Sequence, residues 1–260
     1  MNQHNLASDA SPAVAPAIFL LPPLENGDHL TRAEFERRYH AMPGVKKAEL
    51  IEGRVYMPSP VRFKNNGEPD NQISTWIGLY RALTPDVSAA NNATVRLDEA
   101  NEPQPDVALR IEEAYGGQSF VNADDYLEGA PELVVEIAAS TATYDLREKL
   151  EAYRRNGVRE YIVWATFDAQ VYWFDLAAGA EVSLPADEAG VVCSRVFPGL
   201  WLAVPALLRN DLAGVLHCLQ QGLATPAHQE FVAHLAARAR AHEAGRLESE
   251  DAQAADTPQD

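Results

Sequence analysis

The spacing of apolar residues along the chain predicts helices first and strands later. Residues 31–34 read Thr-Arg-Ala-Glu, which is typical of a helix N-terminus, and the apolar positions that follow recur at three and four residues until Pro43 and Gly44. The same spacing predicts a second helix over about 70–83, with Asp70 as its N-cap. Two helices are therefore expected in the first third of the chain, with a short strand pair between them.

That strand pair and the later strands follow from β-branched and alternating segments. Residues 49–57 predict two strands around a tight turn at Glu52 and Gly53. Further strands are expected at 94–97, 107–111, 132–138, 161–164 and 171–174, and the last two form a predicted hairpin. Further helices are expected over 144–156, about 205–221 and 226–243. The alternation predicts an α/β (α+β) fold, in which helices flank a mixed β-sheet and further helices follow at the C-terminal end.

The same pattern divides the chain into four parts. Residues 1–29 are rich in Ala, Pro, Ser and Asn and lack periodicity, so a disordered N-terminal arm is expected there. Residues 30–205 are expected to form the folded domain, residues 206–245 a C-terminal helical segment, and residues 246–260 an acidic tail.

Composition adds a constraint on partners. The 260 residues include 47% hydrophobic and 23% charged residues, as is usual for a globular domain. The net charge of −17 argues against loose, charge-driven binding to nucleic acid, which needs clustered Lys and Arg. Part of this acidity lies at the C-terminal end, where residues 248–260 carry five acidic residues and no basic one.

The cysteine count and the hydropathy of the chain indicate the cellular compartment in which the protein is expected. Cys193 and Cys218 are too few and too far apart in sequence for a zinc knuckle or a disulfide framework, so a reduced cytoplasmic setting is expected. Residues 13–24 are apolar, but prolines interrupt them and the segment is too short to span a bilayer. No membrane association is expected.

Three acidic residues and one lysine are the candidate chemistry. Glu136 lies near the end of an apolar segment that predicts a strand buried on both faces, where a carboxylate needs a cation, a proton or hydrogen bonds. Asp106 begins another predicted strand, so the two carboxylates can converge at one sheet edge. Carboxylate oxygens are the ligands that Mg²⁺ prefers. Lys149 lies on the helix after the Glu136 strand and can reach back over it, while Glu49 adds a further carboxylate.

Each of these residues also has an ordinary structural explanation. Pro-Asp is a common turn dipeptide, which would account for Asp106. Lys149 follows Asp145 by four residues, so a solvated ion pair on a helix surface explains it equally well. Glu49 could line a hairpin, and Asp145 is most simply a helix cap.

The order of four segments resembles the Uma2 family of restriction endonuclease-like proteins, within the PD-(D/E)XK nuclease superfamily. These segments are residues 49–53, the dipeptide at 105–106, residues 131–137 and residues 145–153. The likeness covers about 30–205 and implies a restriction-endonuclease-like fold. It also implies that Asp106 and Glu136 are metal ligands, Glu49 an additional acidic residue and Lys149 the catalytic lysine, with Tyr153 as its support.

The position of the lysine fits one branch of that superfamily. The general pattern places it two residues after the second acid, where this chain has Ala138. The Uma2-like families place it on the next helix instead, and Lys149 matches that position.

The function expected from residues and resemblance together is hydrolysis of DNA phosphodiester bonds with Mg²⁺ or Mn²⁺. Two alternatives stay open. The first is a catalytically silent binding or scaffold protein on the same fold, which suits the acidic composition. The second is a hydrolase of small nucleotide substrates, for which negative charge is less of a handicap. By analogy with nuclease-fold proteins, a homodimer through residues 205–243 is also expected.

Overall fold

A six-stranded mixed sheet forms the centre of the molecule, in the strand order β11-β10-β9-β8-β5-β3. The computed structural model describes residues 21–57, 60–139, 141–177 and 181–255, the last ten by their backbone alone. The strands are β3 (Val87–Asn91), β5 (Val107–Ile111), β8 (Leu133–Ala138), β9 (Glu160–Ala165), β10 (Gln170–Asp175) and β11 (Val182–Ser183). Strands β8 and β9 are parallel and the other neighbours are antiparallel, which confirms the mixed sheet.

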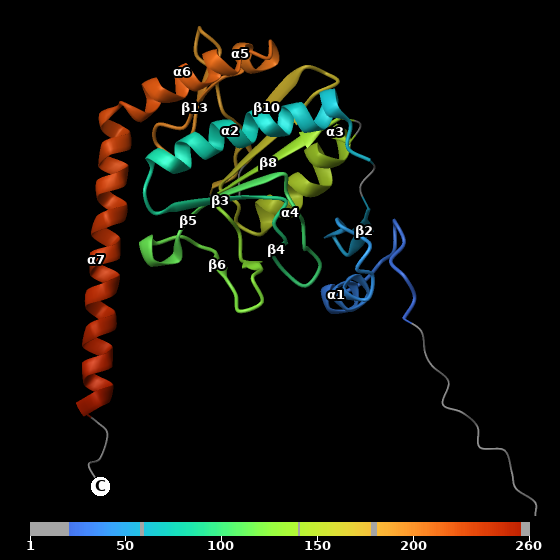
Figure 1. Ribbon diagram of the computed structural model, residues 1–260, viewed down its shortest axis with the longest axis horizontal. Helices are drawn as coiled ribbons and strands as arrows, with labels where there is room; N and C mark the ends of the chain where they lie inside the picture. The colour runs from blue at the N-terminus through green and yellow to red at the C-terminus, as the bar shows by residue number, and fades with distance from the viewer. Residues whose placement is uncertain (1–20, 58–59, 140, 178–180, 256–260) are drawn as a thin grey trace, which may run out of the picture.

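Helices pack against both faces of this sheet (Figure 1). The first face carries α2 (Glu68–Leu83), α5 (Val204–Leu208) and α6 (Leu212–Leu223), and the second carries α3 (Ala142–Tyr144), the π-helical turn η3 (Asp145–Lys149) and α4 (Leu150–Arg155). Ile137 packs in the α2 core, while Val134 and Ala138 pack in the α4 core. Because strand side chains alternate, Glu136 points to the α4 face.

The N-terminal elements follow their local sequence signals. Helix α1 (Arg32–His40) begins after Thr31, whose hydroxyl accepts a hydrogen bond from the backbone N–H of Glu34. The hairpin of β1 (Glu49–Ile51) and β2 (Arg54–Tyr56) turns through Glu52 and Gly53, both at positive φ. The predicted helix and strand pair are therefore confirmed.

Several predicted boundaries are wrong. Asp70 lies inside α2 rather than at its N-cap, because the π-helical turn η1 (Phe63–Gly67) leads directly into the helix. Strand β3 was not expected, although it pairs with β5 along its length. The helix predicted over 205–221 is two helices, because Asn210 adopts a positive φ between them and the Asp211 side chain caps α6.

Smaller elements complete the domain. A three-stranded sheet joins β4 (Val95–Arg96), β7 (Leu127–Glu128) and β6 (Phe120–Val121), and a two-stranded one joins β12 (Val191–Cys193) and β13 (Trp201–Ala203). The 3₁₀ turn η2 (Glu113–Tyr115) lies next to α7. Cys193 and Cys218 are both free thiols.

The two ends differ from the division expected from sequence. Residues 24–30 pack on the domain instead of belonging to a free arm: Leu24 is 4% exposed, and the N–H groups of Gly27 and Leu30 donate to the β-hairpin. Helix α7 (Pro226–Ala255) continues past the predicted end at 243 into the predicted tail and extends along one side of the molecule (Figure 1). Residues 1–20 and 256–260 lie outside the described residues. No helix in the described ranges has the length and apolarity needed to cross a bilayer.

Candidate active site

Lys149 and Glu136 form the centre of the candidate site. The Lys149 ammonium donates to Glu136 Oε1 at 2.9 Å and to Glu49 Oε1 at 3.0 Å. Lys149 is 3% exposed and Glu136 is 4% exposed. The solvated surface ion pair considered for Lys149 is therefore excluded, because the ammonium is buried between two carboxylates that lie far from it in sequence.

Glu49 enters the site because the β1–β2 hairpin docks beside the chain that precedes β5. Leu50 and Glu102 exchange backbone hydrogen bonds at 2.7 and 3.1 Å, which fixes the hairpin there. Glu49 Oε1 also accepts the backbone N–H of Gln104 at 2.8 Å. Glu49 thus does more than line the hairpin, since it joins the hairpin to the helix that carries Lys149.

Asp106 lies across from Glu136, directly before the neighbouring strand β5. Val107 pairs with Val135 in the antiparallel register of β5 and β8, so the next residues along, Asp106 and Glu136, stand opposite each other. Asp106 Oδ2 accepts the backbone N–H of Ile137 at 2.7 Å. Asp106 is close enough for its charge to raise the pKa of Glu136, which lies within β8 rather than at its end.

The π-helical turn η3 adds a carboxylate that was expected only as a cap. Asp145 is buried and its Oδ1 lies 3.9 Å from the Lys149 ammonium. Thr141 is the N-cap residue of α3, and the Tyr161 hydroxyl donates to the backbone carbonyl of Asp145. π-helical turns are frequent at functional sites, and this one brings Asp145 and Lys149 to the same side. The sequence signal for this contact was the spacing of four residues between Asp145 and Lys149.

Three tyrosines border the cluster. The Tyr153 hydroxyl donates to Glu136 Oε1 at 2.8 Å, so it contacts the carboxylate that Lys149 binds rather than Lys149 itself, which the resemblance expects it to support. The ring of Tyr144 lies 5.8 Å from the Lys149 ammonium and 4.2 Å from the ring of Tyr56. Tyr56 in turn donates to the exposed Glu148. The lysine is thus covered by aromatic rings on the side of the β1–β2 hairpin.

The electrostatics of the site reflect an excess of carboxylates. Burial raises the pKa of Glu136; Lys149 opposes that shift, while Asp106, Glu49 and Asp145 add to it. Burial alone would lower the pKa of Lys149, but Glu136, Glu49 and Asp145 raise it well above its usual range. The ammonium is therefore charged at neutral pH, and it does not neutralise all the negative charge gathered around it.

The donor chemistry of the cluster fits a hard divalent cation. Glu49 and Glu136 each use Oε1 for their hydrogen bonds, and in the described part of the chain their Oε2 atoms have no hydrogen-bond partner. Within the described ranges, no three or more His, Cys, Asp and Glu side chains are grouped so that they could hold a metal ion. The three carboxylates expected as ligands, Glu49, Asp106 and Glu136, are therefore not grouped as a metal site, whereas a Mg²⁺ that takes one or two carboxylates plus substrate phosphate oxygens would need only Asp106 and Glu136.

Two further polar residues near Asp106 were not identified from sequence. The Lys47 ammonium lies 3.4 Å from Asp106 Oδ1 and 2.9 Å from Asn92 Oδ1. The pKa of Asp70 is raised by its burial and by the charge of Asp106. Neither has a sequence signal of its own, because Lys47 lies in a loop and Asp70 resembles an ordinary N-cap.

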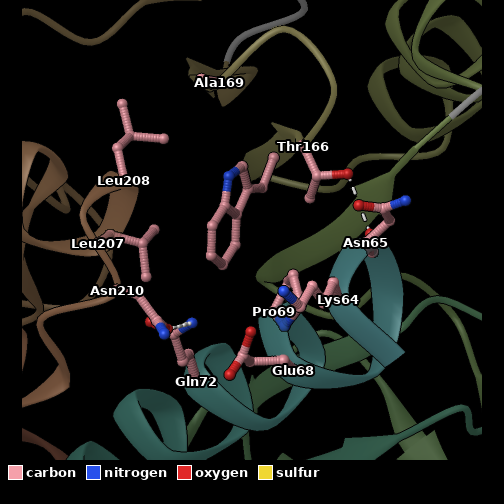
Figure 2. Close-up of a pocket in the computed structure, with 11 residues that line it drawn as sticks. Lys64, Asn65, Glu68, Pro69, Gln72, Thr166, Ala169, Leu207, Leu208 and Asn210 are labelled. Carbon is pink, nitrogen blue, oxygen red and sulfur yellow. Dashed lines mark hydrogen bonds between the residues drawn. The ribbon is translucent and has the colours of Figure 1, made fainter. Parts of the chain in front are cut away.

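A separate cavity of about 180 Å³ lies where η1 and α2 meet the end of β9 and the turn after α5. Figure 2 shows Gln72 and Asn210 pointing toward each other at one side, and Asn65 joined to Thr166 at the other. None of Glu49, Asp106, Glu136 and Lys149 lines this cavity. It is therefore distinct from the carboxylate–lysine cluster.

Comparisons with known proteins agree with the fold. A search of curated proteins finds no match to this chain. Among solved structures, a protein from Anabaena variabilis described as a putative nuclease belonging to DUF820 superposes with a TM-score of 0.51 at 12% identity, over 67% of this chain and 97% of that chain. At that identity the likeness shows a shared fold. The model of the Uma2 family, described as "Putative restriction endonuclease", matches residues 32–205, more than half of the chain, and the protein therefore belongs to the Uma2 family.

Proposed function

We propose that this protein is a metal-dependent endonuclease that hydrolyses DNA phosphodiester bonds, with Mg²⁺ or Mn²⁺ as its cofactor. The observation that carries the proposal is the buried Lys149 ammonium held between Glu49 and Glu136, with Asp106 just before β5 bonded to the backbone beside Glu136. Membership of the Uma2 family supports the nuclease class. DNA as the substrate and the identity of the metal belong to the proposal.

Each residue has a role that its position allows. Asp106 and Glu136 would hold the cation, and Glu49 would support it from the hairpin. A bound Mg²⁺ would neutralise charge that grows on the phosphate oxygens and acidify a coordinated water. Lys149 would orient the attacking water and offset negative charge in the transition state. Tyr153 positions Glu136 through its hydrogen bond and leaves one carboxylate oxygen for the cation.

The remaining expectations stay predictions of the same proposal. A cytoplasmic setting is consistent with two free thiols. A homodimer through the C-terminal helices would place two cleavage sites on one substrate. Sedimentation equilibrium of the full chain would measure the mass in solution.

Plasmid nicking tests the activity. The wild-type protein should convert supercoiled DNA to the nicked form with Mg²⁺ and not with EDTA. Asp106→Asn and Lys149→Ala should each lower the rate by roughly a hundredfold or more, the scale observed when one electrostatic contact to a transition state is removed. Lys46→Ala is the matched control, because Lys46 is exposed. Far-UV circular dichroism would verify folding of each variant.

A catalytically silent scaffold is the second candidate, and a specific observation favours it. Lys149 already binds two of the carboxylates that would surround a metal, and the net charge of −17 disfavours DNA. A wild-type protein that cleaves no DNA, RNA or nucleotide with either metal would support the scaffold. Cleavage of nucleotides alone would support a hydrolase of small substrates.

A further inference from the structure

Four consecutive residues before α2 form an exposed segment of alternating apolar and basic side chains. We name Val61, Arg62, Phe63 and Lys64 the rim segment. Val61 is 77% exposed and Phe63 is 76% exposed. Arg62 and Lys64 are also exposed, and neither has an ion-pair partner among the residues that the structure describes. Large apolar side chains exposed together beside unpaired cations are typical of an interaction surface.

The backbone of the rim segment is held in place although its side chains are exposed. The Arg62 carbonyl accepts the N–H groups of Asn66 and Gly67, both at 3.1 Å. The Asn65 carbonyl accepts the Thr166 hydroxyl at 2.9 Å, a contact drawn in Figure 2. The backbone that carries Phe63 is therefore held in place, while its ring remains exposed to a partner.

The rim segment lines part of the cavity described above through Lys64, and the residue after it is linked to the end of β8, the strand that carries Glu136. Thr166, which holds Asn65, also donates its backbone N–H to the carbonyl of Ala138, two residues beyond Glu136. Before the rim segment, the Tyr56 ring contacts the ring of Tyr144, which lies 5.8 Å from the Lys149 ammonium. After it, Asp70 on α2 lies near enough to Asp106 to respond to its charge.

We propose that the rim segment holds an unpaired nucleotide of the substrate strand next to the bond that is cut, with Phe63 stacked on the base and Arg62 and Lys64 on the flanking phosphates. The inference rests on the proposed nuclease function and adds the kind of DNA that the site prefers: single strands, or duplex that is frayed or mismatched at the cleavage point. Aromatic stacking combined with backbone cations is how proteins bind unpaired strands without reading their sequence.

The chemistry favours a nucleic acid over other occupants. Cations beside apolar side chains also suit a protein or an anionic membrane surface, so the nucleic acid is preferred because the segment belongs to a protein proposed to cut phosphodiester bonds. The rim segment also offers local positive charge on a chain of net charge −17, and a polyanion approaching the site needs such a local contact. In the sequence, the aromatic residue Phe63 has one cationic residue on either side of it.

Binding measured in EDTA tests the rim segment without depending on catalysis. The probe is fluorescein-labelled oligothymidylate, followed by anisotropy with the full chain, and compared with a duplex of the same length. Phe63→Ala should weaken single-strand binding roughly tenfold, as expected for loss of one stacked base, and change duplex binding much less. The double variant Arg62→Ala/Lys64→Ala should lower the slope of log affinity against log salt by about 1.4, since each phosphate contact on a single strand contributes about 0.7.

The matched control is Arg81→Ala/Phe120→Ala, which removes one exposed cation and one exposed aromatic ring away from the rim segment. The inference is overturned if Phe63→Ala binds oligothymidylate like the wild type, or if the control loses as much affinity. It is also overturned if Phe63→Ala changes the oligomeric mass and not DNA binding, which would assign the rim segment to a protein contact.

A separate assay distinguishes failure of the inference from failure of the proposed function. Hydrolysis of thymidine 5′-p-nitrophenyl phosphate by the wild type with Mg²⁺ reports on the catalytic cluster without a DNA strand. If this hydrolysis and plasmid nicking occur while the rim variants bind normally, the nuclease function stands and the inference fails. If neither reaction occurs, the proposed function fails and the EDTA binding data still decide whether the rim segment binds single strands.

Discussion

Replacing Lys149 by Met tests whether the buried ammonium holds the carboxylate cluster together. The substitution keeps the length of the side chain and removes two charge-assisted hydrogen bonds, at 2.9 and 3.0 Å, and the weaker contact to Asp145. Each hydrogen bond to a charged group contributes about 1.5–3 kcal/mol, and breaking a buried ion pair costs about 3–5 kcal/mol. Protonation of Glu136 would offset part of this cost. We therefore expect the free energy of unfolding to fall by about 3 kcal/mol.

Urea unfolding followed by tryptophan fluorescence at neutral pH measures this change. Lys46→Met is the control, and as an exposed lysine it should change the free energy of unfolding by no more than about 0.5 kcal/mol. A solvated ion pair between Lys149 and Asp145 would contribute only about 0.3–0.5 kcal/mol. A loss below about 1 kcal/mol for Lys149→Met would therefore refute the buried arrangement.

Three further predictions follow from other described contacts. Burial raises the pKa of Glu102 from 4.5 to about 8, so the stability that its protonated form contributes is present below pH 4.5 and is lost as the pH rises through 8. At about 1.4 kcal/mol per pH unit this loss reaches up to about 5 kcal/mol; Glu102→Gln should abolish it in urea titrations at several pH values, and equal pH profiles would contradict the prediction. Tyr153→Phe removes a hydrogen bond to Glu136 and should lower both the nicking rate and the free energy of unfolding. The free energy of unfolding should fall by about 1.5–3 kcal/mol, and unchanged values for both quantities would show that the hydroxyl does not position Glu136. Leu24→Ala, in the segment expected to be disordered, should lower the free energy of unfolding by about 2–3 kcal/mol in thermal unfolding, because Leu24 is 4% exposed. Leu21→Ala, at a more exposed leucine, should lower it little, and equal effects of the two substitutions would mean that the segment is not packed.

Much of the fold could be predicted because its signals are local. The capping pattern before α1, the turn at Glu52 and Gly53 and the apolar segment of β8 each depend on neighbouring residues only, and each element forms where its sequence indicates. The need of Glu136 for a partner was also visible, since a charge inside a buried strand is costly wherever the strand lies.

The identity of the partners was decided by tertiary structure. Lys149 has an ordinary helix neighbour in Asp145, and nothing local shows that its ammonium instead turns inward to Glu49, a hundred residues earlier. The packing of Leu24 was equally invisible, because its apolar neighbours Phe35 and Leu50 come together only when the hairpin docks on α1. The sequence thus determined which residues need an interaction partner, because burying an unpaired charge or exposing apolar surface costs free energy. Only the assembled sheet, which brings distant segments within hydrogen-bonding distance, determined which residues meet.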